Sequence, residues 1–220
     1  MELLTATLAH GLRLLDESGR LTPDPTSPEL LFGHHSLFVV DLEMSGSNPQ
    51  LHEVIDLGGI RAALTRSLAE EAVWGARVKP RHIGNAVPGA LKVVGYSPKG
   101  WKDAVELDIA FAKFAEVGRG AVITGWGIGQ DVAFLVESCR RQGIAWPFAP
   151  IAIDVQYIAR FLFKGGSDVD RFNLGHVADR LGIGRMGEHG ALADAYATYD
   201  VLSRLLDRAA AMNVADTAPA

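Results

Sequence analysis

Cysteine is nearly absent from this chain of 220 residues, in which Cys139 is the only one. A single thiol excludes an intrachain disulfide and a cluster of thiolate metal ligands. Long apolar runs are also lacking, since those at 37–40 and 121–124 have the length of strands, whereas a bilayer span needs about 20 residues. Residues 1–20 lack the basic head, apolar run and cleavage site of a secretory signal. We therefore expect a cytoplasmic protein with no membrane span.

An excess of positive charge is a third feature that the chain lacks. The formal net charge is −5, which argues against a broad electrostatic grip on duplex nucleic acid. Basic residues nevertheless gather between apolar segments, at Arg77, Lys79, Arg81, Lys92, Lys99 and Lys102. They form either a local basic patch or a solvated surface, and the sequence leaves both alternatives open.

Hydrophobic periodicity predicts one α/β domain with a short N-terminal extension. Leucines at helical spacing in residues 1–18, followed by three prolines, predict an N-terminal helix and linker over 1–30. Strands are predicted at 37–40, 53–62, 72–79, 121–124 and 151–153, and helices at 101–117, 131–142, 155–163, 172–181 and 190–211. The main domain is expected over 31–210, and a flexible tail over 211–220.

Two carboxylates are predicted to lie side by side at the end of the first buried strand. Residues two apart in a strand point to the same face, so Asp41 and Glu43 project together. Such a pair repels itself unless a hard cation neutralises it, and oxygen ligands of this kind suit Mg²⁺ or Mn²⁺. Taken alone, the Asp-x-Glu pattern is more typical of a solvated strand edge.

Further acids in suitable positions favour the metal-site interpretation. Asp131 stands at a strand-to-helix junction, and Asp194 stands at the entry to the last helix, five residues after His189. Within one regular helix that step would turn the two side chains about 140° apart, so we place His189 on the preceding loop. Gly187 and Gly190 lie on either side of it, and glycine tolerates the unusual backbone angles that such a loop can require.

This ordered set resembles the histidine (DEDDh) subgroup of the DEDD exonuclease superfamily. The resemblance covers about residues 36–207, and three segments carry it: Val40-Asp41-Leu42-Glu43-Met44-Ser45-Gly46, Gly125-x-x-Ile128-x-Gln130-Asp131, and His189-Gly190-Ala191-Leu192-Ala193-Asp194-Ala195. The first two resemble oligoribonucleases, and the third is closer to proofreading exonuclease subunits and RNase T.

The resemblance implies an RNase H-like fold, with a mixed five-stranded sheet flanked by helices, and an exonuclease domain over 31–210. It also implies a 3′–5′ exonuclease that uses two divalent cations, Mg²⁺ or Mn²⁺, to release nucleoside 5′-monophosphates from single-stranded DNA or RNA or from short oligonucleotides. Its relatives are often dimers, so a homodimer is one expected assembly. The implied metal ligands are Asp41, Glu43, Asp131 and Asp194, and the implied general base is His189.

Three residues beside the acids are candidates for substrate contact. Leu42 and Met44 flank Glu43 and would touch the terminal base, although Leu42 is equally compatible with the core. Trp126 could stack on an unpaired base or pack inside the protein. The pair Trp126-Gly127 also replaces polar residues that many relatives carry before the aspartate of the second motif. This departure keeps open a second hypothesis, that the chain is a catalytically silent nucleic-acid-binding or adaptor module of the same fold.

Overall fold

Seven strands form one sheet in the computed structural model, which describes residues 2–16, 19–23, 28–163, 172–184 and 190–217. The strand order is β2-β1-β7-β6-β3-β4-β5. The strands are β1 (Leu12–Leu15), β2 (Leu21–Pro23), β3 (Ser36–Met44), β4 (Val54–Ala63), β5 (Glu70–Arg77), β6 (Val122–Gly125) and β7 (Ile151–Asp154).

The centre of the sheet is mixed, as the resemblance to the exonucleases implied. β6 runs parallel to both β3 and β7, whereas β4 pairs antiparallel with β3 and with β5. Residues 37–40 of β3 are fully or almost fully buried because helices cover both faces of the sheet, which explains their unbroken apolar run. The predicted α/β architecture is confirmed, and β1 and β2 extend the expected five strands to seven.

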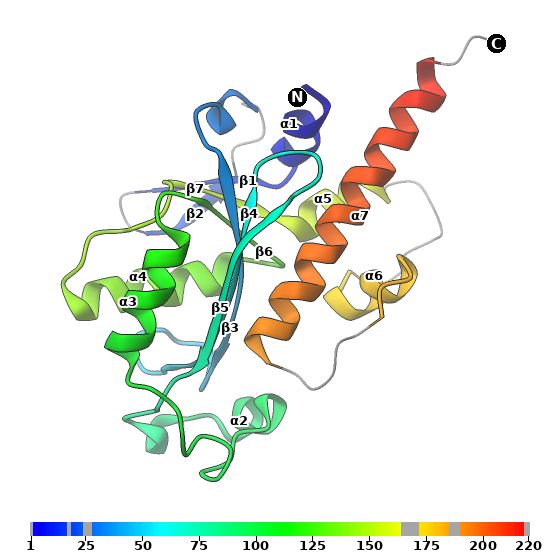
Figure 1. Cartoon of the computed structure of the whole chain (residues 1–220). Coiled ribbons are helices and arrows are strands. Elements are labelled where there is room, and N and C mark those ends of the chain that lie inside the picture. The colour runs from blue at the N-terminus through cyan, green and yellow to red at the C-terminus, as the bar shows by residue number, and fades with distance from the viewer. Residues whose placement is uncertain (1, 17–18, 24–27, 164–171, 185–189, 218–220) are drawn as a thin grey trace.

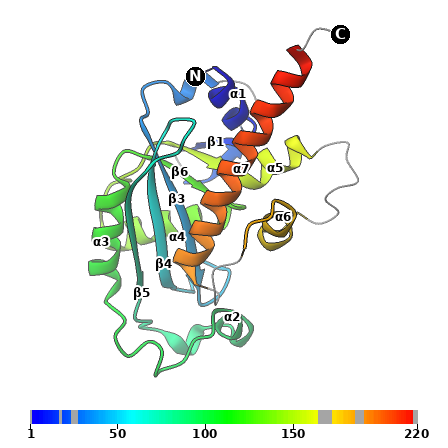
Figure 2. The same ribbon diagram turned by 45° about the vertical axis from the view of Figure 1, so that its right-hand side comes forward.

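Helices cover both faces of the sheet (Figures 1 and 2). One face carries α3 and α4, and the other carries α1, α5, α6 and α7, while α2 lies beyond the end of the strands. The helices are α1 (Glu2–Ala9), α2 (Pro88–Val94), α3 (Leu107–Gly118), α4 (Gly129–Gln142), α5 (Val155–Leu162), α6 (Leu174–Arg180) and α7 (Ala191–Thr217), with 3₁₀ turns at Pro28–Leu31 and Ile83–Asn85. Among the described helices, none is both long and apolar enough to cross a membrane.

The N-terminal segment differs from its prediction. The first helix ends at Ala9, and residues 12–15, predicted to be helical, form β1 and pair with β7. The change of direction falls at Gly11, where an added Cβ would lie 2.5 Å from the carbonyl oxygen of Asp154. Leucine spacing alone could not reveal this, because pairing with a strand distant in sequence overrides local periodicity.

Two helix boundaries also differ from the prediction. α3 begins at Leu107 and not at 101, because the Trp101 indole N–H donates to the carbonyl of Ile55 and holds residues 101–106 against the sheet edge. α7 continues to Thr217, into the segment predicted to be a tail from 211, since its alanines favour a helix. The division of the chain at 31 and 211 stays a prediction.

Candidate metal centre

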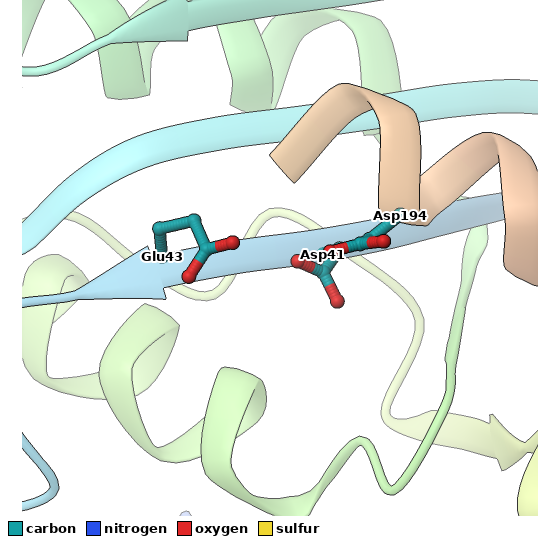
Figure 3. A group of neighbouring side chains, drawn as sticks. All are labelled: Asp41, Glu43 and Asp194. Carbon is teal, nitrogen blue, oxygen red and sulfur yellow. The ribbon is translucent and has the colours of Figure 1, made fainter. Parts of the chain in front are cut away.

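Three carboxylates meet at the end of β3. Asp41 and Glu43 come from this strand and Asp194 from the first turn of α7, and one oxygen of each lies within 4.8 Å of the others. Figure 3 shows the three side chains facing a common space, although their elements lie far apart in the sequence. The strand alternation read from the sequence is therefore confirmed by the geometry.

The fourth predicted acid lies beside this group. Asp131 belongs to the first turn of α4 and is 8% exposed, and its Oδ1 accepts a hydrogen bond of 3.0 Å from the backbone N–H of Leu42. This bond joins the start of α4 to β3 between the two acids of the strand. Asp131 is therefore held next to the carboxylate group formed by Asp41, Glu43 and Asp194.

Burial and mutual repulsion hold these acids towards their neutral form. Burial raises the pKa of Asp41 well above its ordinary value, and the negative charges of Asp131 and Glu43 add to the effect. The pKa of Glu43 rises to about 7, mainly through burial and then through the charges of Asp194 and Asp56. Burial also raises the pKa of Asp131 to about 7. Such a cluster becomes stable in its ionised form when a cation enters it.

An acid that the sequence analysis missed lies next to the group. Asp56 of β4 stands directly opposite Glu43 in the β3–β4 ladder, and burial raises its pKa. The residue fell inside a predicted strand, 53–62, but its place opposite Glu43 depends on strand register. Register is set by pairing across the sheet, so no local signal in the sequence reveals this neighbour.

Asp154 holds the second motif in place. Its Oδ1 accepts hydrogen bonds of 3.0 Å from the backbone N–H groups of Gly127 and Gln156, so it joins the loop after β6 to the start of α5. The side chain of Gln130 donates to the carbonyl of Ser47 at 2.7 Å and ties the same motif to the loop after β3. The two motif loops are therefore fixed relative to each other.

The three residues predicted to contact substrate, Leu42, Met44 and Trp126, lie in different environments. Leu42 is 4% exposed and faces the core under α3 and α4, because the alternation that groups Asp41 and Glu43 turns it to the opposite face. The structure thus gives its side chain a core role and does not support a substrate contact. Trp126 is partly buried against the core beneath α5 and α7.

Met44 lines a cavity of 420 Å³ beside the acids. Glu43 and Gln130 contribute to the same cavity, and most of its remaining lining is aliphatic: Val87, Ala90, Val93 and Val94 at or within α2. The backbone N–H of Val87 donates to the carbonyl of Ser45 at 2.8 Å, which holds the start of α2 over the end of β3. This aliphatic wall was not expected from the sequence, because α2 was not among the predicted helices.

Acids pair with three of the six residues of the predicted basic patch, Lys79, Arg81 and Lys102. Glu106 pairs with Lys79 at 3.3 Å and with Arg81 at 2.9 Å. The guanidinium of Arg77 lies 4.5 Å from the centre of the Trp101 ring and donates to a backbone carbonyl.

His189 lies outside the described residues, so the position of the predicted general base is untested.

Residues 38–202 match the sequence profile of the RNase T family, which is described as an exonuclease. The chain belongs to this exonuclease family. It is 25% identical over 213 residues to a Mycobacterium tuberculosis protein named as a bifunctional exonuclease/endonuclease, covering 94% of this chain and 31% of that protein. The resemblance to DEDD exonucleases read from the motifs is thus confirmed at the level of the family.

Solved structures share the fold. E. coli Exonuclease I in complex with a dT13 oligonucleotide superposes with a TM-score of 0.69 at 18% identity, over 82% of this chain and 43% of that one. The nuclease domain of 3′hExo, a DEDDh family member bound to rAMP, superposes with a TM-score of 0.61 at 19% identity, over 80% and 94%. The RNase H-like exonuclease fold expected from the sequence is confirmed. This family member spans less than half of Exonuclease I and less than a third of the mycobacterial protein.

Proposed function

We propose that this chain is a divalent-metal-dependent 3′–5′ exonuclease that acts on single-stranded nucleic acid or short oligonucleotides and releases nucleoside 5′-monophosphates. The observation that carries the proposal is the convergence of Asp41, Glu43 and Asp194 within 4.8 Å in a member of an exonuclease family. Asp131 beside them completes the acidic set that the motifs predicted.

The donor chemistry of the site fits hard divalent cations. Every predicted ligand is a carboxylate, and oxygen-only donors favour Mg²⁺ or Mn²⁺ over softer metals. We infer that Asp41, Glu43, Asp131 and Asp194 would hold two such ions. When bound, a pair of ions supplies positive charge that stabilises both the attacking and the leaving oxygen of an in-line phosphoryl displacement.

His189 is the proposed general base. Its ordinary pKa near 6.5 suits removal of a proton from the attacking water at neutral pH. It directly precedes Gly190, whose carbonyl accepts the backbone N–H of Asp194 in the first turn of α7. This adjacency supports a base close to the acids.

The cavity beside Glu43 suits the terminal nucleotide. Its walls combine Met44 and the aliphatic side chains of α2 with the carboxylate of Glu43, so an apolar base face and a charged centre adjoin each other. Exonuclease I was solved with a DNA oligonucleotide and 3′hExo with a ribonucleotide. Both DNA and RNA ends are therefore reasonable substrates to compare.

The test is cleavage of a 5′-labelled single-stranded oligonucleotide with Mn²⁺ or Mg²⁺. A 3′–5′ exonuclease shortens the labelled strand step by step, whereas attack from the other end would release the label at once as a mononucleotide. His189→Ala should remove most of the activity while the thermal unfolding midpoint stays close to that of the wild type. Parallel DNA and RNA oligonucleotides of several lengths would define the preferred substrate.

Two outcomes would contradict the proposal. Early release of the 5′ label would reverse the polarity, and full activity of His189→Ala would remove the histidine from the mechanism. Binding of the oligonucleotide in fluorescence anisotropy without metal-dependent cleavage would instead favour the silent binding module, which the Trp126-Gly127 pair left open.

A further inference from the structure

α7 rests directly on β4 at the point where it delivers Asp194. In the β3–β4 ladder, Asp41 stands opposite Gly58, and Glu43 stands opposite Asp56. Residues that stand opposite each other in a ladder share a face of the sheet. Gly58 and Asp56 therefore lie on the face that carries the acids of β3 and that α7 covers.

Gly58 allows a backbone-to-backbone contact that no other residue would permit. A Cβ added there would lie 2.3 Å from the carbonyl carbon of Ala191 and 2.3 Å from the amide nitrogen of Leu192. These are main-chain atoms of the first turn of α7, so no side-chain rotation can relieve the overlap. Any side chain at position 58 must lift or shift the helix start, and Asp194 belongs to this turn.

Asp56 supplies an acceptor for one of the backbone N–H groups that the first turn of α7 leaves without a partner inside the helix. The carbonyl of Gly190 accepts the N–H of Asp194, which makes Gly190 the cap position, and glycine has no side chain to accept a hydrogen bond. The Oδ2 of Asp56 instead accepts the N–H of Ala191 at 3.4 Å. Its Oδ1 accepts the N–H of Leu57 at 3.0 Å, which orients the carboxylate.

We propose that Asp56 and Gly58 are positioning residues. Together they fix how closely the first turn of α7 approaches β4 and where the helix begins, so that the Asp194 carboxylate reaches those of Asp41 and Glu43. The inference rests on the proposed function only in treating these acids as metal ligands. Asp56 acts here through its hydrogen bond to the helix, and Gly58 acts through the space that it leaves.

The experiment measures Mn²⁺ affinity by isothermal titration calorimetry and amide hydrogen exchange along α7, in the full chain. Gly58→Ala should weaken Mn²⁺ binding tenfold or more and speed exchange in the first turn of α7, with little change in the middle of the helix. Gly84→Ala is the matched control, because a Cβ added there meets nothing within 4 Å. It should match the wild type in both measurements.

A pair of substitutions at position 56 separates the hydrogen bond from the charge. Asp56→Asn keeps one acceptor oxygen for the N–H of Ala191 and gives up only the local acceptor for the N–H of Leu57, so it should retain Mn²⁺ affinity within about threefold. Asp56→Ala removes the acceptor and should weaken binding about three- to tenfold and speed exchange at Ala191. Asp103→Ala, at a side chain that is 86% exposed, controls for the loss of an acid.

Two results would overturn the proposal. The first is a Gly58→Ala variant with unchanged Mn²⁺ affinity and unchanged exchange in α7. The second is an equal loss of Mn²⁺ affinity in Asp56→Asn and Asp56→Ala, which would assign Asp56 a role through its charge. The Asp56 pair keeps the test decisive if Gly58→Ala does not fold. Exchange and Mn²⁺ binding are measured without nucleic acid. A wild-type chain that fails to cleave oligonucleotides would therefore contradict the proposed function without deciding whether Asp56 and Gly58 position α7.

Discussion

Two glutamates in this molecule are held in opposite electrostatic states. Glu137 on α4 pairs with Arg140 at 2.7 Å and with Arg141 at 2.8 Å, and hydrogen bonds from these arginines lower its pKa to about 2. Glu43 is half-buried among acids, and its pKa rises to about 7. The protein thus neutralises the first glutamate with its own side chains, whereas among the described residues the charges that act on the second are those of the acids Asp194 and Asp56. The comparison teaches that the acidic cluster, unlike Glu137, is suited to hold an external cation.

The largest expected contrast between these two regions is in catalysis. Asp41→Asn should lower kcat/KM by roughly 10²- to 10³-fold or more, because it removes a charge that is needed to hold the cations at the reacting phosphate. Glu137→Gln should leave kcat/KM within about twofold, since its pKa is set by two arginines of α4 and by none of the acids of the cluster. Steady-state cleavage of a labelled oligonucleotide measures both. Similar losses in the two variants would erase the distinction.

The next contrast concerns stabilisation by metal. At pH 8, Mn²⁺ at about 100 times its dissociation constant should raise the free energy of unfolding by about 2.7 kcal/mol, because the ion binds the folded cluster and not the unfolded chain. Asp41→Asn should lose most of this gain, and Glu137→Gln should keep it. Chemical denaturation with and without Mn²⁺, with EDTA as the reference, provides the measurement. A gain that survives in Asp41→Asn would place the ion elsewhere.

The smallest contrast is in the response of the metal-free protein to pH. The folded-state pKa of Glu43 is raised from 4.5 to about 7, so its ionisation destabilises the fold as pH rises through this window, by roughly 1 kcal/mol after solvent screening. Glu137 has the opposite sign: its lowered pKa contributes stability above pH 4.5 that is lost as pH falls towards 2.

Substitutions separate the two ways in which pH lowers the stability of the metal-free protein, through Glu43 as pH rises and through Glu137 as pH falls. Glu43→Gln should reduce the loss of stability between pH 4.5 and 7, to which Asp131 also contributes, and Glu137→Gln should reduce only the loss at acidic pH. Thermal unfolding midpoints across pH 2 to 8, measured in EDTA, test both arms. A Glu43→Gln profile that matches the wild type would show that repulsion at the cluster does not limit stability.

The acids could be predicted from sequence because each lies in a segment whose local pattern is strong. Asp41 and Glu43 follow a buried strand with a two-residue period, and Asp194 begins a long amphipathic helix. Asp131 was added to these three acids by its position at a strand-to-helix junction and by the resemblance of the ordered motifs to DEDD exonucleases. Local pattern was sufficient wherever a residue's place depends only on the element that carries it.

The remaining features depend on contacts between segments that are distant in sequence. β1 is a strand because β7 offers it an edge, and Asp56 is relevant because of the register between two strands. The side chain of Leu42 was placed at the site by its neighbours in the motif, although strand alternation turns it into the core. Pairing, register and packing of this kind carry no signature in a short window of sequence.

The docking of α7 onto β3 and β4 also has a consequence for synthesis of the protein. β3 and β4 leave the ribosome early, whereas the helix that brings Asp194 is the last described element of the chain. The acidic cluster therefore cannot assemble before α7 has been synthesised, however well the sheet has formed. Metal binding at this cluster thus has to wait for α7.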